Sequence, residues 1–334
     1  MNLFCNLYQS SEQRGSIKMQ TTQVQPPKRY PTNLLAKEHW AQRVFYSYNV
    51  PKMQEFLNKI HDLEVYEDDV WLVTLPKCGT TWMQELLWLV MNNFDFATAK
   101  SEHLELRSPF MEFDFLIYHD LERAFKPIES LKRPRLIKSH LSLGLLPAQI
   151  WDKKPKVIYV SRNPKDAFVS EYHFFRHMGD FSADHTLEDY LNNRMEGTSS
   201  NEQFDNMTEY YALRSEPWLY YTSYERMKTD LRSVIQDVCQ FLNKSIDEET
   251  MQQMLKHLSF EEMKKNPTTN HHWEIEQIHR ERQVSLDDFN FCRKGKVNGY
   301  KEEISPAMVM KLDKWVQDKM KLYDTTLEDL LVLN

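Results

Sequence analysis

The chain has 334 residues, of which 41% are hydrophobic and 27% charged, a composition typical of a folded globular protein with room for one large α/β domain or two small ones. The formal net charge of −7 disfavours a broad nucleic-acid-binding surface, so a polyanionic ligand must be held by a local basic cluster. The four scattered cysteines lack metal-ligand spacing, and no apolar run resembles a signal peptide or a membrane span. We therefore expect a cytoplasmic protein with reduced thiols, no metal and no membrane partner.

The N-terminal region is polar and contains no regular apolar spacing. We expect residues 1–32 to be a flexible extension and residues 33–334 to form one domain, since no repeat or linker divides the rest of the chain. Apolar residues at helical spacing predict helices within 34–45 and 51–60.

The most informative segment comes next, at residues 67–92. A β-branched apolar run from Val70 to Leu75 predicts a buried strand, and helical spacing begins again after Gly79. A strand, a tight turn and a helix N-terminus together make an anion site, because the first helical N–H groups have no partner within the helix and the helix dipole is positive there.

The residues of this turn favour phosphate binding over simple packing. Gly79 lets the backbone approach a phosphate closely, Lys77 adds an ammonium group, and Thr80 and Thr81 add hydroxyl donors. The GxxxxGKS/T pattern of P-loop nucleotidases is absent, because the lysine precedes the glycine. We therefore predict a turn that is only P-loop-like.

Two further strands are predicted to end in charged or polar residues. The stretch 133–140 ends in Lys138 and His140, and the buried run 157–160 is followed by Arg162, with Pro164 at the first position of a helix. A strand over 217–227 and helices over 226–243, 247–257 and 305–320 complete the pattern. Strands that alternate with helices predict an α/β fold with a central, mostly parallel sheet flanked by helices.

In such sheets ligands bind outside the carboxyl ends of the strands. We therefore expect Lys77, Lys138 with His140, and Arg162 to converge on one crevice. Taken singly, each has a structural explanation, but several cations in one crevice repel one another unless an anion lies between them. The aromatic residues of 108–120 are interpreted as core, with the wall of an apolar ligand pocket as the alternative.

A ligand with two separated phosphate-type groups fits these clusters. One group would bind the 77–82 turn, and the other would bind Arg162, Ser170 and the loop 293–295. His140 offers a base next to the ammonium of Lys138, which suits in-line transfer of a charged group from a nucleotide to a hydroxyl. The histidines at 271, 272 and 279 match no standard metal site and are interpreted as part of a polar loop.

The turn PKCGTTW (76–82) resembles the PKSGTTW signature of the cytosolic sulfotransferases. Similar motifs follow in the same order at KSHL (138–141), YVSRNPKDAFVSEYHF (159–174), YTSYERMK (221–228), SFEEMKKNP (259–267) and FCRKG (291–295). The resemblance covers roughly residues 35–300, and five ordered motifs are far more specific than one.

The resemblance implies 3′-phosphoadenosine 5′-phosphosulfate (PAPS) as the sulfuryl donor, with no metal. It implies the following sites: Lys77, Gly79, Thr80 and Thr81 for the 5′-phosphosulfate; Arg162, Ser170, Arg293, Lys294 and Gly295 for the 3′-phosphate; Trp82, Tyr224 and Phe260 for the adenine; and Phe110 and Phe174 for the acceptor. It also implies that His140 takes the acceptor's proton while Lys77 and Lys138 stabilise charge on the transferring and bridging oxygens, with Ser170 beside them.

The chain departs from the family pattern at several positions. Cys78 replaces a serine in the turn, Leu258 stands where a threonine or serine is common, and Tyr300 lies in NGYK, where GDWK is usual. The family's dimerisation pattern near the C-terminus is not recognisable, so the oligomeric state stays open, with a homodimer as one alternative.

We expect a PAPS-dependent sulfotransferase that acts on a small lipophilic hydroxyl compound such as a phenol, a retinoid-like alcohol or a steroid, with amines as a further class. A phosphotransferase is the closest enzymatic rival, but it needs magnesium and the missing P-loop pattern. Two more hypotheses compete with sulfate transfer: a sulfotransferase-like carrier without turnover, and a dehydratase that acts through a sulfated intermediate.

Overall fold

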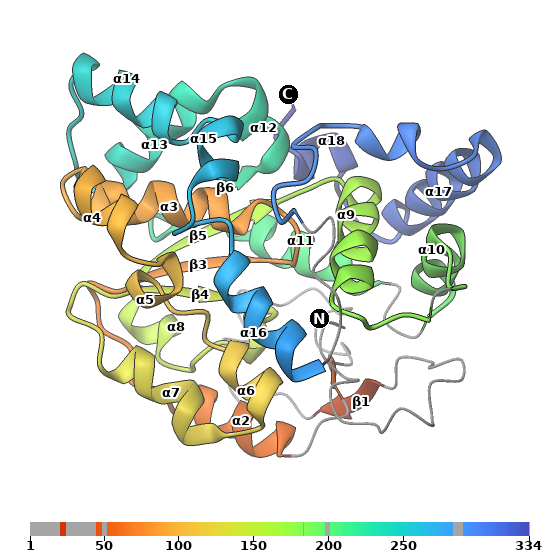
Figure 1. Ribbon diagram of the computed structural model, residues 1–334, viewed down its shortest axis with the longest axis horizontal. Helices are drawn as coiled ribbons and strands as arrows, with labels where there is room; N and C mark the ends of the chain where they lie inside the picture. The colour runs from red at the N-terminus through yellow and green to blue at the C-terminus, as the bar shows by residue number, and fades with distance from the viewer. Residues whose placement is uncertain are drawn as a thin grey trace.

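The main sheet of the protein consists of four parallel strands in the order β4-β3-β5-β6. The computed structural model describes residues 21–24, 45–48, 52–182, 184–197, 201–282 and 290–333. The strands are β3 (Val70–Thr74), β4 (Leu136–Ser139), β5 (Lys156–Ser161) and β6 (Leu219–Ser223). They are almost wholly buried and helices cover both faces of the sheet (Figure 1), which confirms the predicted α/β fold.

Successive side chains of each strand point to opposite faces and enter two different hydrophobic clusters. Trp71 and Tyr159 pack on one face, whereas Leu72 and Ile158 pack on the other. The first face is covered by α2 (Met53–His61), α6 (Phe113–Tyr118), α7 (Leu121–Glu129), α9 (Pro164–His177), α10 (Leu187–Glu196), α11 (Glu202–Ala212) and α17 (Pro306–Met320). The second is covered by α3 (Thr80–Met91), α13 (Leu231–Phe241) and α14 (Glu248–His257).

The remaining helical segments connect these layers. They are α4 (Phe96–Ser101), α5 (Leu104–Arg107), η1 (Leu143–Leu145), α8 (Ile150–Lys153), α12 (Tyr224–Thr229), α15 (Phe260–Lys265), α16 (His272–Arg282), η2 (Gly299–Glu302) and α18 (Leu327–Leu330). In Figure 1, α16 crosses in front of the main sheet.

Pro164 begins α9, as predicted from the sequence. The helix predicted at 305–320 is α17, and Ser305 caps it by accepting a hydrogen bond from the amide of Met308. The strand predicted over 217–227 is shorter than expected. It ends at Ser223, whose hydroxyl accepts the amide of Arg226 at 3.0 Å and starts α12.

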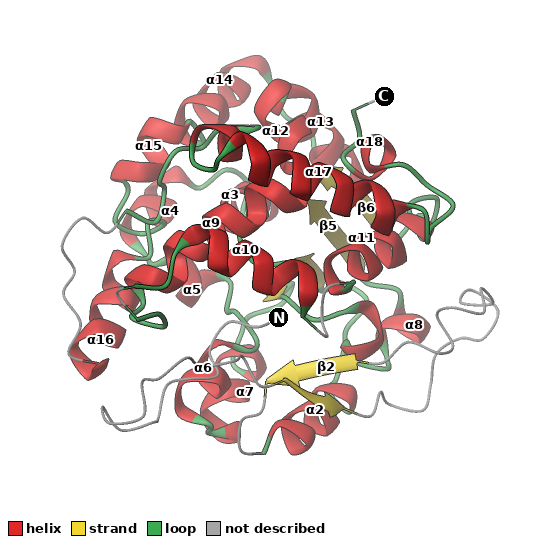
Figure 2. Ribbon diagram, turned by 90° about the vertical axis from the view of Figure 1, so that its right-hand side faces the viewer, coloured by secondary structure: helices red, strands yellow, loops and turns green. Residues whose placement is uncertain are grey.

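The N-terminal region is described at two short stretches. Residues 21–24 of the predicted extension form β1 (Thr21–Val24), which pairs antiparallel with β2 (Phe45–Tyr48) in a sheet separate from the main one (Figure 2). The flexibility expected of the extension stays a prediction, and the rest of the extension lies outside the described residues. The helix predicted within 34–45 also lies outside them, except for Phe45 in β2, while the helix predicted within 51–60 is α2. The boundary at residue 33 stays a prediction.

The register of the main sheet determines where the functional segments meet. Val73 lies opposite Ser139 of β4, and Thr74 lies opposite Val160 of β5. The carboxyl ends of these three strands are therefore neighbours, and the residues that follow them emerge at one edge.

Candidate active site

The carboxyl edge of the sheet opens into a cavity of about 1570 Å³, counted together with its mouth to solvent. Every site residue predicted from the sequence lines it. These residues are Lys77, Gly79, Thr80, Thr81, Trp82, Phe110, Lys138, His140, Arg162, Ser170, Phe174, Tyr224, Phe260, Arg293, Lys294 and Gly295. The three strand ends thus converge on one crevice, while the role of each residue stays a prediction.

The turn after β3 contains two residues in the left-handed conformation, Lys77 with φ 62° and Gly79 with φ 89°. A Cβ atom at position 79 would lie 2.8 Å from Cδ2 of Tyr224, so both the backbone and the adjacent ring require glycine. The carbonyl of Lys77 accepts a hydrogen bond from Nη1 of Arg162 at 2.5 Å. This bond ties the turn to the end of β5.

Helix α3 begins directly after this turn, and no side chain caps its N-terminus. Its first amide groups and the positive end of its dipole are therefore available to an anion. Two hydroxyls lie beside them. Oγ1 of Thr80 is 2.5 Å from Oγ1 of Thr74, and Oγ1 of Thr81 is 3.0 Å from Nε2 of His271. The turn has the donors of a phosphate or sulfate site.

The ammonium group of Lys77 lies between two aromatic rings, 4.0 Å from the centre of Phe291 and 4.6 Å from that of Phe174. Burial lowers the pKa of Lys77 to about 7, and the positive charges of Arg162 and Arg293 contribute to this shift. A bound anion would supply a counter-charge and would therefore raise the pKa of Lys77 again. The state of this lysine is therefore coupled to occupation of the site.

His140 follows β4 and has a defined tautomer. Its Nδ1 lies 2.8 Å from the carbonyl oxygen of Thr74, which can only accept, so Nδ1 carries the proton and Nε2 has the lone pair. Burial, with a further contribution from the charge of Lys138, lowers the pKa of His140 to about 3. The imidazole is therefore neutral at physiological pH. Its ring packs against Phe110 with centroids 4.6 Å apart.

The ammonium of Lys138 is held by a carboxylate that the sequence analysis missed. Nζ of Lys138 lies 2.8 Å from Oε1 of Glu105, and the other oxygen of Glu105 accepts the amide of Phe110 at 3.1 Å. Nδ1 of His271 lies 3.7 Å from the same carboxylate. Because His271 also contacts Thr81, this network joins the two ends of the cavity.

A second basic cluster lies on the other side of the turn. The guanidinium carbon of Arg162 lies 4.2 Å from the ring centre of Tyr224, and its buried Nε has no hydrogen-bond partner in the described part of the chain. Arg293 and Lys294 follow on the loop after residue 290, together with Gly295 at φ 61°. Any side chain at position 295 would clash with the ring of Phe260.

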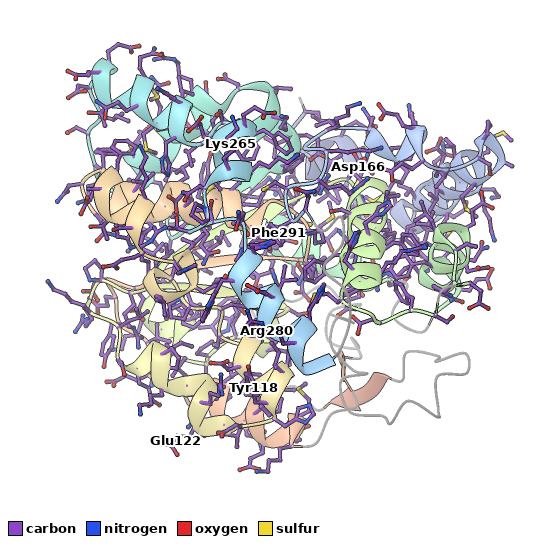
Figure 3. The ribbon with its side chains drawn as sticks, viewed as in Figure 1. Tyr118, Glu122, Asp166, Lys265, Arg280 and Phe291 are labelled. Carbon is purple, nitrogen blue, oxygen red and sulfur yellow. The ribbon has the colours of Figure 1, made fainter. Side chains whose placement is uncertain are left out.

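The end of the cavity near His140 is apolar. Phe110, Phe113 and Phe174 line it, together with Met178, directly after α9, and Ile275 of α16. Phe291, labelled in Figure 3, lies close to the start of α16, where its ring centre is 4.5 Å from that of His271. This end suits a lipophilic molecule.

Comparison with known proteins defines the family. The sulfotransferase domain model matches residues 67–324. Luciferin sulfotransferase of Photinus pyralis is 35% identical over 280 residues, which are 79% of this chain and 74% of that protein. Sulfotransferase 1E1 of Bos taurus is 30% identical over 276 residues, which are 81% of this chain and 91% of that protein. The chain belongs to the sulfotransferase family.

Solved structures agree with this assignment. The crystal structure of retinol dehydratase in complex with retinol and PAP has a TM-score of 0.72 and 26% identity to this sulfotransferase, covering 85% of this chain and 89% of that chain. Mouse sulfotransferase SULT7A1 complexed with PAP has a TM-score of 0.63 and 22% identity over 82% of this chain and 91% of that chain, which supports the fold. The expected enzyme class is confirmed.

The departures from the family pattern lie in or beside the cavity of this sulfotransferase. Leu258 and Tyr300 line it, and Cys78 is buried beneath the turn. The expectation of a polar loop at the histidines 271, 272 and 279 is wrong, because His272 and His279 belong to helix α16. His279 is buried as well, and His271 is buried against Thr81 and Phe291. His271 and Phe291 had no periodic signal, although Phe291 begins the motif 291–295 and His271 follows the motif 259–267 closely.

In the part of the chain that the structure describes, no cluster of three histidine, cysteine or acidic side chains has the arrangement of a metal site. Within the same residues, none of the helices combines the length and the hydropathy needed to cross a bilayer.

Proposed function

We propose that this protein transfers the sulfuryl group of PAPS to the hydroxyl of a small lipophilic acceptor, with His140 as the general base. The observation that carries the proposal is the geometry of His140. Its Nδ1 proton is fixed on the carbonyl of Thr74, so the basic Nε2 belongs to a neutral imidazole in the same cavity as the anion-binding turn. Retinol dehydratase, which is 26% identical and was solved in complex with PAP, supports PAPS as the donor.

The predicted donor site divides into three parts. The proposed contacts are Lys77, Gly79, Thr80 and Thr81 with the 5′-phosphosulfate; Arg162, Ser170, Arg293, Lys294 and Gly295 with the 3′-phosphate; and Trp82, Tyr224 and Phe260 with the adenine. Arginine suits the 3′-phosphate because its fork of donors matches phosphate oxygens. The aromatic residues offer flat faces to the base. Ser170, on α9, also lines the cavity and is proposed to complete the catalytic set.

In the proposed reaction the acceptor oxygen forms a bond to sulfur while the sulfur–oxygen bond to the 5′-phosphate breaks. The acceptor's hydroxyl proton moves to Nε2 of His140, and adenosine 3′,5′-bisphosphate (PAP) leaves. Lys77 and Lys138 stabilise the negative charge that develops on the transferring group and on the bridging oxygen. Binding of an anionic donor offsets their positive charges, which strengthens His140 as a base when it is needed.

The acceptor is proposed to bind in the apolar end, between Phe110 and Phe174. Phenols, retinoid-like alcohols and steroids fit this chemistry, and one similar structure holds retinol. A single methylene group changes preference in such a pocket only modestly, so we expect a broad acceptor range. A cytoplasmic location and a homodimer remain predictions.

The test is transfer of radiolabelled sulfate from PAPS to a panel of phenols, allylic alcohols, steroids and amines. His140→Ala should lower kcat by about 10²–10⁴-fold, because a positioned base contributes that much. Lys77→Met should also lower it. His61→Ala, on α2 and outside the cavity, is the matched control and should keep full activity. Unchanged transfer by His140→Ala would remove this histidine from the mechanism.

A second outcome is suggested by the similarity to retinol dehydratase. With an allylic alcohol, the transferred sulfate can depart as the leaving group while a neighbouring carbon loses a proton, so that a new carbon–carbon double bond forms. Mass spectrometry of the product distinguishes the two reactions, since a sulfate ester is heavier than the alcohol and the dehydrated product is lighter. Binding of PAP without any product from the panel would instead favour a carrier.

A further inference from the structure

Glu303 forms the centre of a charge cluster behind the predicted 3′-phosphate site. Its carboxylate lies 2.8 Å from Nη1 of Arg293, 3.0 Å from Nζ of Lys294 and 2.6 Å from Nε2 of His173. Burial opposes its ionisation, but the hydrogen bonds from these three residues outweigh burial and lower the pKa of Glu303 to about 2. The carboxylate is therefore an anion at every physiological pH.

The carboxylate and its partners have different positions relative to the cavity. Arg293 and Lys294 line the cavity, whereas Glu303 does not, and its side chain is only 12% exposed. The described contacts of Arg293 engage Nη1 alone, which leaves Nε and Nη2 as donors for a ligand. Glu303 thus holds the two basic side chains from behind, while their remaining donors stay available.

The cluster is also anchored to α9. His173 belongs to that helix, and so does Asp166, whose carboxylate accepts the amides of Asn298 at 2.7 Å and Tyr300 at 3.0 Å. Asp166 is labelled at the start of α9 in Figure 3. The chain around Glu303 is therefore fixed to the helix that also carries Ser170, so Glu303 can orient the two basic side chains relative to it.

We infer that Glu303 is a positioning residue that gives this site its preference for nucleotides with a 3′-phosphate. This inference rests on the proposed function. Arginine and lysine side chains are long and lose rotational freedom when they bind a ligand. Contacts that fix them beforehand reduce that loss. Glu303 also neutralises part of the repulsion between the two cations in the free protein. If Glu303 instead competed with the phosphate for Arg293 and Lys294, replacing Glu303 would strengthen nucleotide binding.

Calorimetric titration with two nucleotides tests the inference. We compare the full-length protein and its Glu303→Gln variant with PAP and with adenosine 5′-phosphate, which lacks the 3′-phosphate. The variant should bind PAP about tenfold more weakly, while its affinity for adenosine 5′-phosphate should change by less than about twofold. The second nucleotide also shows that the variant is folded.

Glu248→Gln is the matched control, because this exposed carboxylate pairs with Arg232 at 2.8 Å and neither of the two residues lines the cavity. It should alter neither affinity by more than about twofold. In turnover, Glu303→Gln should raise the KM for PAPS and leave kcat unchanged. Equal weakening of both nucleotides, no weakening, or tighter PAP binding would each overturn the inference. A wild-type protein that does not prefer PAP over adenosine 5′-phosphate would instead overturn the proposed donor.

Discussion

The low pKa of Lys77 leads to a quantitative prediction about donor binding. With a pKa of about 7, about nine-tenths of the Lys77 side chains are neutral at pH 8 in the free protein. A phosphate group in the turn supplies the missing counter-charge and should return the pKa toward its ordinary value of about 10.4. Binding of PAP at pH 8 should therefore take up about 0.9 proton. If the pKa of Lys77 returned fully to its ordinary value, the free energy coupling PAP binding to protonation of Lys77 would be roughly 4–5 kcal/mol, which is an upper limit.

Isothermal titration calorimetry in buffers of different ionisation enthalpy measures this uptake directly. Both phosphates of PAP are ionised at pH 8, so the ligand should contribute little. The affinity for PAP should also fall by up to about tenfold per pH unit above pH 7, because a smaller fraction of Lys77 then carries the proton that binding requires. Lys77→Met should abolish the uptake, whereas Lys228→Met, which changes another cavity lysine, should keep it. An uptake below about 0.2 proton in the wild type would refute the assignment of a neutral Lys77.

Two further predictions concern the framework of the site. Asp69→Asn breaks a buried ion pair with Arg135, in which the nitrogen and oxygen atoms are 2.5 Å apart, and should lower the free energy of unfolding in urea by about 3–5 kcal/mol. Asp68→Asn changes the exposed ion pair with Arg133 and should lower it by at most about 1 kcal/mol. A small effect at both positions would contradict this ranking. Gly79→Ala should lower the free energy of unfolding by about 1–2 kcal/mol for the left-handed backbone alone, which thermal unfolding measures. It should also weaken PAP binding, measured by calorimetry, because the added Cβ displaces the ring of Tyr224. An unchanged affinity for PAP would mean that the ring moves aside without affecting the site.

The convergence of the catalytic segments was predictable because it follows from local pattern and sheet topology. Each of the three strands is a short apolar run that ends in a charged or polar residue, and parallel strands present their carboxyl ends at one edge. Lys77, His140 and Arg162 could therefore be placed together before any contact was known. Tyr224 was placed correctly in the site but in the wrong element, because the capping role of Ser223 was overlooked.

The contacts between distant segments were not predictable. Glu105 meets Lys138 across 33 positions, and His271 meets Thr81 across 190, so no spacing rule applies to either pair. Both contacts depend on how α5 and the segment before α16 pack over the sheet. The significance of Glu303 was likewise hidden, because a carboxylate in a charged stretch is usually solvated. Its role emerges only from its burial and its three partners.

The strand order of the main sheet also arranges the proposed reactants in a row. The end of β4 carries His140 for the acceptor, the turn after β3 carries Lys77 for the transferred group, and the ends of β5 and β6 carry Arg162 and Tyr224 for the nucleotide. The sulfuryl group would therefore travel across the strands toward one margin of the sheet. The segment of Phe110, which pairs with Lys138 beyond that margin, can diversify to accept new hydroxyl compounds without changing the donor half, whereas the opposite wall of the pocket, Phe174, belongs to α9 after β5. A chimera that exchanges only the segments outside β4 should thus inherit a new acceptor range together with the original affinity for PAP.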